Sequence, residues 1–529
     1  MGRKPSKLSE DRKHDYEESK GLLSGSVRDD ASDIDDDTER TEWSRSRLLC
    51  VAISFIVLLV TGAFARVWYV RPPPTHYEDG IALHGAELQS NGTHEFKRTV
   101  LIVSIDGLRA DYLDRGLTPH LLEISKQGLR AKSMIPIFPT LTFPNHWALM
   151  TGLHAESHGI VANNFWDPSL KTEFHYNSAA ASWDPAWWFG EPMWETANKA
   201  GLITANLMWP GPPKMSSGAS PTYFEPWRDK VPLQEKLDQI MQWIDLPIEE
   251  RPQLIMAYEP SLDQAGHLTG PMSALVNKTL GYVDTFAKDL STELAVRNLT
   301  SIVDVVFVSD HGMTDTSNPE FIYVDDILGS DGMDAIQHTD GWPSMGIRFK
   351  EGTNVTEMLS RLEKAVDARE DGAFDVFTHE TMPERWHFSG IDRIAPVYVV
   401  PKIGYALTTR QEGEDGMSKG NHGYDNRNQQ MHAMFVAHGP FTSVVKAVHQ
   451  SREEGGVVSR LARRVLSRPN KGWHSTADDT YVMDSFANVE IYGLVMKLLG
   501  VGAFAAPTNG TEGSGTAISD IRGHGRHVR

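Results

Sequence analysis

Cysteine is nearly absent from this chain, which has a single one, Cys50, among its 529 residues. One thiol cannot form an intrachain disulfide, so the fold must rely on its core and on other noncovalent contacts. Apolar residues make up 40% of the sequence, which is enough for a sizeable core. The length fits one large domain or roughly two to three ordinary ones.

Positive charge is also in short supply. The 51 lysines and arginines are outnumbered by 70 aspartates and glutamates, which gives a formal net charge of -19. Nonspecific binding of nucleic acid needs a basic surface, so this balance argues against a nucleic-acid-binding protein. Internal repeats are absent as well.

Residues 1–47 contain no asparagine, whereas five Asn-X-Thr sequons occur later in the chain. This first segment is polar and dense in charge, including the run DDASDIDDDTE, and is predicted to be a disordered tail. Sugars are added in the secretory lumen, so the one-sided distribution indicates that the later part is lumenal or external. The candidate glycosylation sites are Asn91, Asn277, Asn298, Asn354 and Asn509.

One long apolar run, LLCVAISFIVLLVTGAFA, covers the 18 residues Leu48–Ala65 without a charge. As a helix it would be about 27 Å long, close to the thickness of a bilayer core. We predict a transmembrane helix over 48–70, with the N-terminus in the cytosol because basic residues precede it. A buried core helix or a cleaved signal peptide fits the polar, Pro-rich flanks and the long preceding segment less well. Cys50 could be acylated, but an inert membrane thiol is the expectation.

The rest of the chain divides by composition into a stalk, a large globular part and a tail. The stalk covers 71–97, the globular part 98–505 and the disordered tail 506–529, with a flexible basic insert at about 442–473. Short runs rich in Val and Ile, such as VLIVSI, VDVVFV and APVYVVP, alternate with helical patterns. One such helix has Thr118 as its cap and Gly128 as its stop. This alternation predicts an α/β fold with a mostly parallel sheet and helices on both faces.

The stretch PTLTFPNHWALMTG allows two interpretations of Thr142. Threonine is a favoured N-cap, Pro144 fits a first helical turn, and Gly152 is a natural stop. Alternatively, Thr142 is a nucleophile at a helix N-terminus, where an anion is stabilised. The two interpretations are compatible.

Acidic and histidine side chains follow several of the predicted strands. Since ligands bind beyond the carboxyl ends of strands in open α/β sheets, these side chains are expected to meet. Mixed carboxylate and imidazole ligands suit zinc, and two divalent metals can clamp the oxygens of a displacement at phosphorus. A metal would also activate the Thr142 hydroxyl, with Asn163 as the oxyanion donor. The candidate ligands are Asp106, Asp263, His267, Asp310, His311 and His422.

These motifs resemble the ectonucleotide pyrophosphatase/phosphodiesterase family of the alkaline phosphatase superfamily, most closely its fungal type II membrane members. The resemblance covers roughly residues 98–505 in family order. Its carrying motifs include SIDGLR, TFPNHWALMTGLHAESHGIVANN, MWPG, EPSLDQAGHLTGP, VSDHGM and GNHGYDN. It implies an alkaline-phosphatase-like central sheet.

By that resemblance, two zinc ions form the cofactor. Asp263, His267 and His422 would hold one ion, and the other would be held by Asp106, Thr142, Asp310 and His311. Thr142 would attack a phosphodiester or pyrophosphate of a nucleotide. Water would then hydrolyse the nucleotidyl-threonine and release a nucleoside 5′-monophosphate.

The resemblance also implies a base pocket. Phe143 and Tyr258 would sandwich the base, and Trp209 of MWPG matches a pocket residue, although core packing explains such aromatics equally well. The chain departs from nucleotide-selective animal members in reading WPGPP for WPGSD, in having Leu141 before the threonine, and in a longer EPSLD spacing. These departures concern base preference and leave the metal chemistry untouched.

Three other functions remain open at this stage. The same site could serve a lysophospholipid or choline-phosphate diesterase, or a phosphomonoesterase. A catalytically silent membrane scaffold is disfavoured because all seven candidate ligand positions are present. A sulfatase is disfavoured because the only cysteine lies in the predicted span.

Overall fold

The computed structural model describes residues 88–413, 417–453, 473–475 and 480–510. The predicted cytosolic tail, the predicted span, most of the stalk and much of the basic insert lie outside these residues, as does the tail beyond 510. Among the described helices, none combines the length and apolar character needed to cross a bilayer. The described start of the predicted insert, up to Glu453, belongs to a helix, α13 (Pro440–Glu453).

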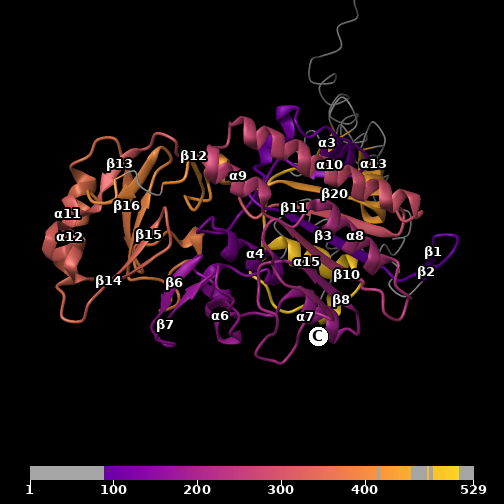
Figure 1. Ribbon diagram of the computed structural model, residues 1–529, viewed down its shortest axis with the longest axis horizontal. Helices are drawn as coiled ribbons and strands as arrows, with labels where there is room; N and C mark the ends of the chain where they lie inside the picture. Colours follow the sequence, from indigo (N-terminus) through magenta and orange to yellow (C-terminus); the bar gives the residue numbers. More distant parts are fainter. Residues whose placement is uncertain (1–87, 414–416, 454–472, 476–479, 511–529) are drawn as a thin grey trace, which may run out of the picture. The chain divides into compact units, whose positions relative to one another are not determined.

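A nine-stranded central sheet organises the fold (Figure 1). Five adjacent strands, β11, β3, β10, β8 and β9, run parallel to one another. In spatial order the strands are β21 (Trp473–Ser475), β22 (Tyr481–Met483), β4 (Leu129–Ala131), β20 (Phe435–His438), β11 (Val303–Val308), β3 (Thr99–Ile105), β10 (Leu254–Glu259), β8 (Thr204–Leu207) and β9 (Tyr223–Glu225).

The sheet is mixed: five of its eight described strand pairings are parallel, in line with the mostly parallel sheet that was expected, and three are antiparallel. The run MHAMFVA forms β20, which is antiparallel to both β11 and β4. The chain enters β20 from the loop that carries His422, beside the carboxyl ends of the parallel strands. Without a crossover helix to return it to the other end, the strand must run backwards.

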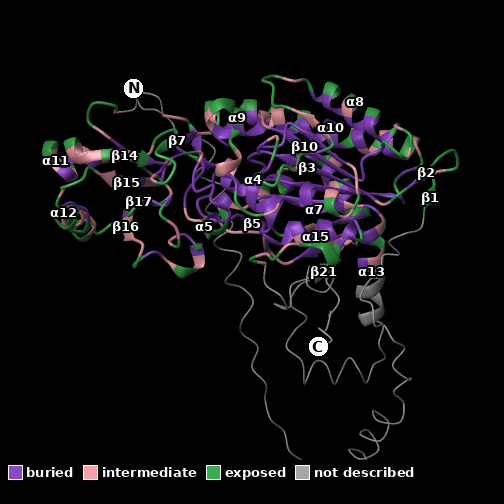
Figure 2. Ribbon diagram, turned by 90° about the horizontal axis from the view of Figure 1, so that it is seen from below, coloured by how far each residue is buried: buried purple, intermediate pink, exposed green. Residues whose placement is uncertain are grey.

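Helices cover both faces of this sheet, as expected, because its strands alternate their apolar side chains. In β3, Val100 and Ile102 join one core, and Leu101 and Val103 join the other. The first core contains side chains of α4 (Thr142–Thr151), α7 (Met193–Lys199), α13 and α15 (Glu490–Leu498). The second contains those of α3 (Pro119–Gln127), α8 (Leu233–Ile244), α9 (Ser261–Thr269) and α10 (Ala274–Val296). Figure 2 shows the buried strands between these layers.

A separate four-stranded antiparallel sheet was not anticipated. It consists of β14 (Ile336–Asp340), β15 (Met345–Phe349), β17 (Val397–Pro401) and β16 (Phe374–Thr378), and it packs on α11 (Val324–Ala335) and α12 (Val355–Asp367) around a third core. APVYVVP, expected in the main sheet, forms β17 here. An apolar run indicates a buried strand but carries no information about which sheet it joins.

The remaining elements are short. The small strands are β1 (Gln89–Ser90), β2 (Glu95–Phe96), β5 (Met134–Ile135), β6 (Asn164–Asp167), β7 (Thr172–His175), β12 (Thr314–Asp315), β13 (Glu320–Tyr323), β18 (Tyr405–Thr408), β19 (Gly420–Asn421) and β23 (Phe486–Ala487). The short α-helices are α5 (Ala155–His158) and α6 (Ala179–Ser182). The 3-10 turns are Ala110–Arg115, Pro185–Trp187, Glu384–Trp386, Gln429–Met431 and Gly502–Phe504.

The start of α3 shows how tertiary structure replaces a local signal. Thr118 occupies the N-cap position as predicted, but its side chain makes no capping hydrogen bond and its buried hydroxyl has no partner. Instead Asp284 of α10 accepts hydrogen bonds from the backbone N–H groups of His120 and Leu121, at 3.0 and 2.7 Å. The cap is therefore supplied by a residue distant in the sequence.

We expect Asp284→Ala to lower the free energy of unfolding by about 1–2 kcal/mol, because two N–H groups at the end of α3 lose their acceptor. Thr118→Val is the matched control and should be neutral or slightly stabilising, since it removes a buried hydroxyl without a partner. Urea unfolding measures both. A larger loss for Thr118→Val than for Asp284→Ala would contradict this account.

Candidate active site

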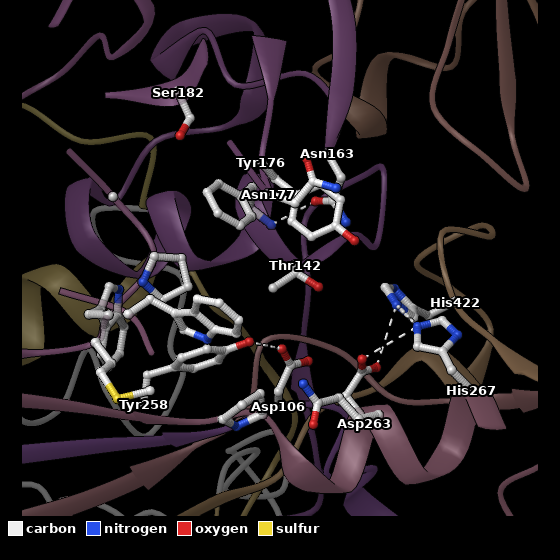
Figure 3. Close-up of a pocket in the computed structure, with 18 of the residues that line it drawn as sticks. Asp106, Thr142, Asn163, Tyr176, Asn177, Ser182, Tyr258, Asp263, His267 and His422 are labelled. Carbon is white, nitrogen blue, oxygen red and sulfur yellow. Dashed lines mark hydrogen bonds and ion pairs between the residues drawn. The ribbon is translucent and has the colours of Figure 1, made fainter. Parts of the chain in front are cut away.

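The predicted ligands converge at the carboxyl ends of three parallel strands. Figure 3 shows Asp106, Asp263, His267 and His422 around Thr142. Asp106 follows β3, and Asp310 and His311 come shortly after β11. Helix α9, which follows β10, carries Asp263 and His267 one turn apart, and His422 follows β19. Gly107 allows the close approach: its φ is +67°, and a Cβ there would lie 3.1 Å from Asp263. The adjacent parallel strands β3 and β11 thus bring together Gly107 and Asp310, which are 203 positions apart in the chain.

Asp106, Asp310 and His311 form a first group whose ligand atoms lie within 4.8 Å of one another. The His311 Nε2 atom is 3.4 Å from Asp106 Oδ1 and 3.0 Å from Asp310 Oδ2. The hydroxyl of Thr142 lies 3.3 Å from the same Nε2 atom. The predicted nucleophile therefore belongs to this group.

Asp263, His267 and His422 form a second group of the same compactness. The Nε2 atoms of the two histidines are 3.1 Å apart, and each lies about 3.5 Å from an Asp263 oxygen, at 3.4 and 3.5 Å. The rings of His422 and His311 stack with centroids 3.5 Å apart, so the two groups are direct neighbours.

Backbone contacts orient all three imidazoles for metal binding. Each Nδ1 atom lies within hydrogen-bonding distance of a carbonyl: that of Gly420 for His267, of Thr140 for His422 and of Gly312 for His311. With Nδ1–H as the donor, every Nε2 atom presents a lone pair to the centre. This tautomer is the one that ligates metals through Nε2.

The carboxylates Asp106 and Asp310 resemble the imidazoles in that one oxygen accepts a hydrogen bond from the protein and the other oxygen is available to a cation. Asp106 accepts a hydrogen bond from the Tyr258 hydroxyl, and Asp310 accepts one from the Gly107 N–H at 3.2 Å. One buried oxygen of each of Asp106, Asp263 and Asp310 has no hydrogen-bond partner. Buried unpartnered oxygens facing bare imidazole nitrogens fit a divalent cation in each group.

The shifted pKa values of the site residues also fit a bound cation in each group. Burial, together with repulsion from neighbouring carboxylates, raises the pKa of Asp106. Burial likewise raises the pKa of Asp263, although nearby histidines oppose the shift. Burial and the neighbouring imidazoles of His311 and His267 lower the pKa of His422. A bound cation would favour ionised aspartates and neutral histidines, which are the forms that act as ligands.

Thr142 differs from its predicted role as an N-cap. It is the first residue of α4, Leu141 is the N-cap, and no side chain at that cap position bonds to the helix. The Asn163 Oδ1 atom instead accepts a hydrogen bond from the Phe143 N–H at 2.9 Å. This bond leaves the Thr142 hydroxyl uncommitted to capping. It also leaves the Asn163 amide N–H groups available to an oxyanion, because Asn163 lines a cavity beside Thr142.

His146 is a site residue that the sequence analysis did not identify. It is fully buried, one turn after Thr142, with its Nδ1 atom 2.8 Å from the Thr142 carbonyl oxygen and 3.4 Å from Asp310 Oδ2. Its Nε2 atom lies 2.9 Å from the Ser104 hydroxyl. The sequence spacing could have identified His146, since a histidine four residues after Thr142 lies on the same face of a helix.

A cavity of about 800 Å³ opens beside both groups. Phe143, Trp209 and Tyr258 all line it, as predicted for a base pocket. Tyr258 is only 6% exposed and its hydroxyl is bonded to Asp106, so it also supports the first group. The aromatic lining residues that carry no sequence motif, and were not predicted, are Tyr176, Trp183, Phe224 and Trp227.

The five sequons all lie within the described residues. Asn298, Asn354 and Asn509 are exposed, whereas Asn91 and Asn277 are half-buried. The Asn277 side-chain oxygen accepts a hydrogen bond from Arg115 at 2.8 Å, and the Asn509 oxygen accepts one from the His154 N–H at 2.8 Å. Glycosylation at these positions stays a prediction.

A buried threonine hydroxyl beside two compact carboxylate–histidine groups, at the strand ends of an α/β sheet, fits the site of a hydrolase for phosphate esters. The family model for type I phosphodiesterase / nucleotide pyrophosphatase matches residues 100–425. The chain belongs to this family, the ectonucleotide pyrophosphatase/phosphodiesterases of the alkaline phosphatase superfamily.

Relatives support this membership over different lengths. A pyrophosphatase/phosphodiesterase of Schizosaccharomyces pombe is 36% identical over 400 residues, covering 73% of this chain and 81% of the relative. Ectonucleotide pyrophosphatase/phosphodiesterase 1 of Saccharomyces cerevisiae is 34% identical and covers 66% of this chain, which spans 54% of that relative. Family member 3 of Rattus norvegicus is 32% identical, and the chain spans 43% of it.

Solved structures share the fold. Murine ectonucleotide pyrophosphatase/phosphodiesterase 5 superposes with a TM-score of 0.65 at 30% sequence identity, covering 78% of this chain and 98% of that protein. An inactive threonine-to-alanine variant of the same murine protein, in complex with AMP, superposes equally well.

We expect His146→Leu to lower kcat/KM for a phosphodiester by about 10–100-fold, because Thr142 and Asp310 lose a neighbour that positions them. His146→Asn should recover part of the loss, since its amide can donate to the Thr142 carbonyl. His158→Leu, at another fully buried histidine, is the control and should lower the melting temperature without a comparable loss of turnover. Equal losses for the Leu and Asn variants would show that His146 only fills space.

Proposed function

We propose that the protein is a two-zinc nucleotide pyrophosphatase/phosphodiesterase that works through a covalent threonine intermediate. The main support for this proposal is the arrangement of three imidazoles, those of His267, His311 and His422. Each has its Nδ1 atom facing a backbone carbonyl and its Nε2 atom facing carboxylate oxygens that have no hydrogen-bond partner. The Thr142 hydroxyl lies next to them. Nitrogen and oxygen ligands in this mixture suit zinc better than magnesium or calcium.

Each group holds one ion in this proposal. Asp263, His267 and His422 supply three ligands to one, and Asp106, Asp310 and His311, with Thr142, surround the other. When bound, the two ions stabilise negative charge on the phosphoryl oxygens and lower the pKa of the threonine hydroxyl.

The chain's own residues carry the rest of the chemistry. The Thr142 oxygen attacks phosphorus, and the bond to the leaving phosphate or alcohol breaks in line with it. The Asn163 amide, fixed by its bond to the Phe143 N–H, donates to a phosphoryl oxygen as charge develops there. Water then cleaves the threonine–phosphorus bond, which restores the hydroxyl and releases a nucleoside 5′-monophosphate.

A nucleotide substrate is supported by two further observations. The murine structural neighbour has been solved as an inactive threonine-to-alanine variant with AMP, the type of product that this reaction releases. In this chain, aromatic residues surround the cavity beside Thr142, and base stacking contributes about 1–3 kcal/mol per base.

The proposed location is a membrane, with a single type II span over 48–70 and the catalytic part extracellular or in a secretory or vacuolar lumen. The one-sided sequons and the ectonucleotide names of the relatives support it.

Replacing Thr142 tests the covalent mechanism. Thr142→Ala should lower turnover of the p-nitrophenyl ester of TMP by at least about 1,000-fold, because the attacking oxygen is gone. Zinc content by mass spectrometry should stay near two per chain, since each group keeps three other ligands. Thr151→Ala is the control: Thr151 is buried in the same helix and bonds only to Trp147 and Leu153 backbone groups.

Near-normal turnover by Thr142→Ala would remove this residue as the nucleophile. Chelator-insensitive turnover by the unaltered protein would remove the metals. Faster hydrolysis of p-nitrophenyl phosphate, or of a lysophospholipid, than of any nucleotide would replace the proposed activity by a phosphomonoesterase or a lipid diesterase.

Phe143 tests the base pocket. Its ring lies in the cavity wall at 5.6 Å from the Tyr176 ring and 5.9 Å from the Phe174 ring. We expect Phe143→Ala to raise KM for nucleotides about tenfold, as the loss of one stacking contact implies, and to change KM for bis(p-nitrophenyl) phosphate much less. Similar changes for both substrates would mean that Phe143 serves only in packing.

A further inference from the structure

One lysine stands out in the wall of the cavity. Among the described residues that line it, Asp106, Asp263 and Glu225 are acidic, and Lys419 is the single lysine or arginine. Its side chain is exposed, and within the described part of the chain no carboxylate forms an ion pair with its ammonium group.

The backbone of Lys419 is fixed next to the second group. Its N–H donates to the His267 carbonyl at 2.8 Å, and its carbonyl accepts from the Thr316 N–H at 2.9 Å and from the Ser317 hydroxyl at 3.2 Å. The next residue, Gly420, pairs with Asp315 in the β12–β19 ladder. The position of the Lys419 backbone is therefore tied to that of a predicted metal ligand, His267, while the Lys419 side chain is exposed.

The two sides of the cavity have different characters. Tyr258 lies beside Asp106 on one side of Thr142, and His267 and His422 lie on the other (Figure 3). Lys419 adjoins the histidine side, together with Gln264 and Ser418. The aromatic side suits a nucleoside, and the histidine side is where a leaving group departs from an attacking Thr142 oxygen.

We infer that Lys419 binds the outer phosphates of the leaving group and so directs the enzyme toward nucleoside di- and triphosphates. The inference rests on the proposed function. In the step concerned, the Thr142 oxygen forms its bond to the α-phosphorus, the bond from that phosphorus to the bridging oxygen breaks, and pyrophosphate leaves with the electron pair. Three buried aspartates offset most of the charge of two zinc ions, so outer phosphates need a further cation.

Two substrates with the same nucleoside test whether Lys419 binds the outer phosphates of the leaving group. dTTP and the p-nitrophenyl ester of dTMP share the thymidine 5′-phosphoryl group, but one releases pyrophosphate and the other a p-nitrophenolate that bears no phosphate. Lys419→Ala should lower kcat/KM for dTTP about tenfold, the loss of one charge-assisted contact, and change that for the ester less than about twofold. Lys419→Arg should keep most of the dTTP activity.

Lys214→Ala is the matched control. It removes one positive charge from an exposed position that does not line the cavity, and it should leave the ratio of the two substrates unchanged. A change in the ratio for this variant as large as that for Lys419→Ala would attribute the effect to overall charge and overturn the inference.

Binding gives a readout that is independent of turnover. By calorimetry on the full-length protein, Thr142→Ala/Lys419→Ala should bind dTTP about tenfold more weakly than Thr142→Ala alone, with dTMP affinity unchanged. Equal loss for both ligands, or for both substrates in the kinetic assay, overturns the inference, as does no loss for either. Failure of the proposed function appears differently, as no hydrolysis of either substrate by the unaltered protein.

Discussion

The site depends on the close approach of three buried carboxylates, Asp106, Asp263 and Asp310. Like charges in a dry interior repel strongly, and burying them costs free energy that packing alone does not offset. The sheet forces the approach, because Asp106 and Asp310 follow neighbouring strands and Gly107 lets α9 come near. The neighbouring histidines His267, His311 and His422 and, in the proposed function, two cations provide the compensation. The core thus holds the charges in place, and the ions make the arrangement favourable.

A second constraint concerns the nucleophile, which must be oriented without being consumed by local hydrogen bonding. Asn163 caps the first turn of α4, and His146 holds the Thr142 carbonyl from the following turn. The Thr142 hydroxyl therefore faces His311 instead of the helix end. The same Asn163 contact fixes which of its amide atoms remains for substrate. In the proposed function, this one hydrogen bond would set the geometry of both attack and charge stabilisation.

In the proposed function, the cavity determines how the substrate is oriented relative to Thr142. Aromatic side chains line the cavity, and Lys419 lies beside His267 with its backbone tied to that residue. A nucleotide entering in the proposed mode would place its base among the rings and its outer phosphates near the ammonium group. Substrate preference would then reflect the two ends of the cavity, whereas bond cleavage depends on the groups between them.

The sequence by itself identified the carboxylates and histidines that meet in the site and their positions after strands, because an aspartate or histidine after a buried Val/Ile run is a local pattern. It also determined the alternation of apolar residues that places helices on both faces. Only the tertiary structure decided the reversed direction of β20, the separate sheet that contains β17, the cap that Asp284 supplies to α3, and the position of Lys419 beside His267 in the cavity wall. Each of these is a contact between segments distant in the chain, and local pattern carries no information about such partners.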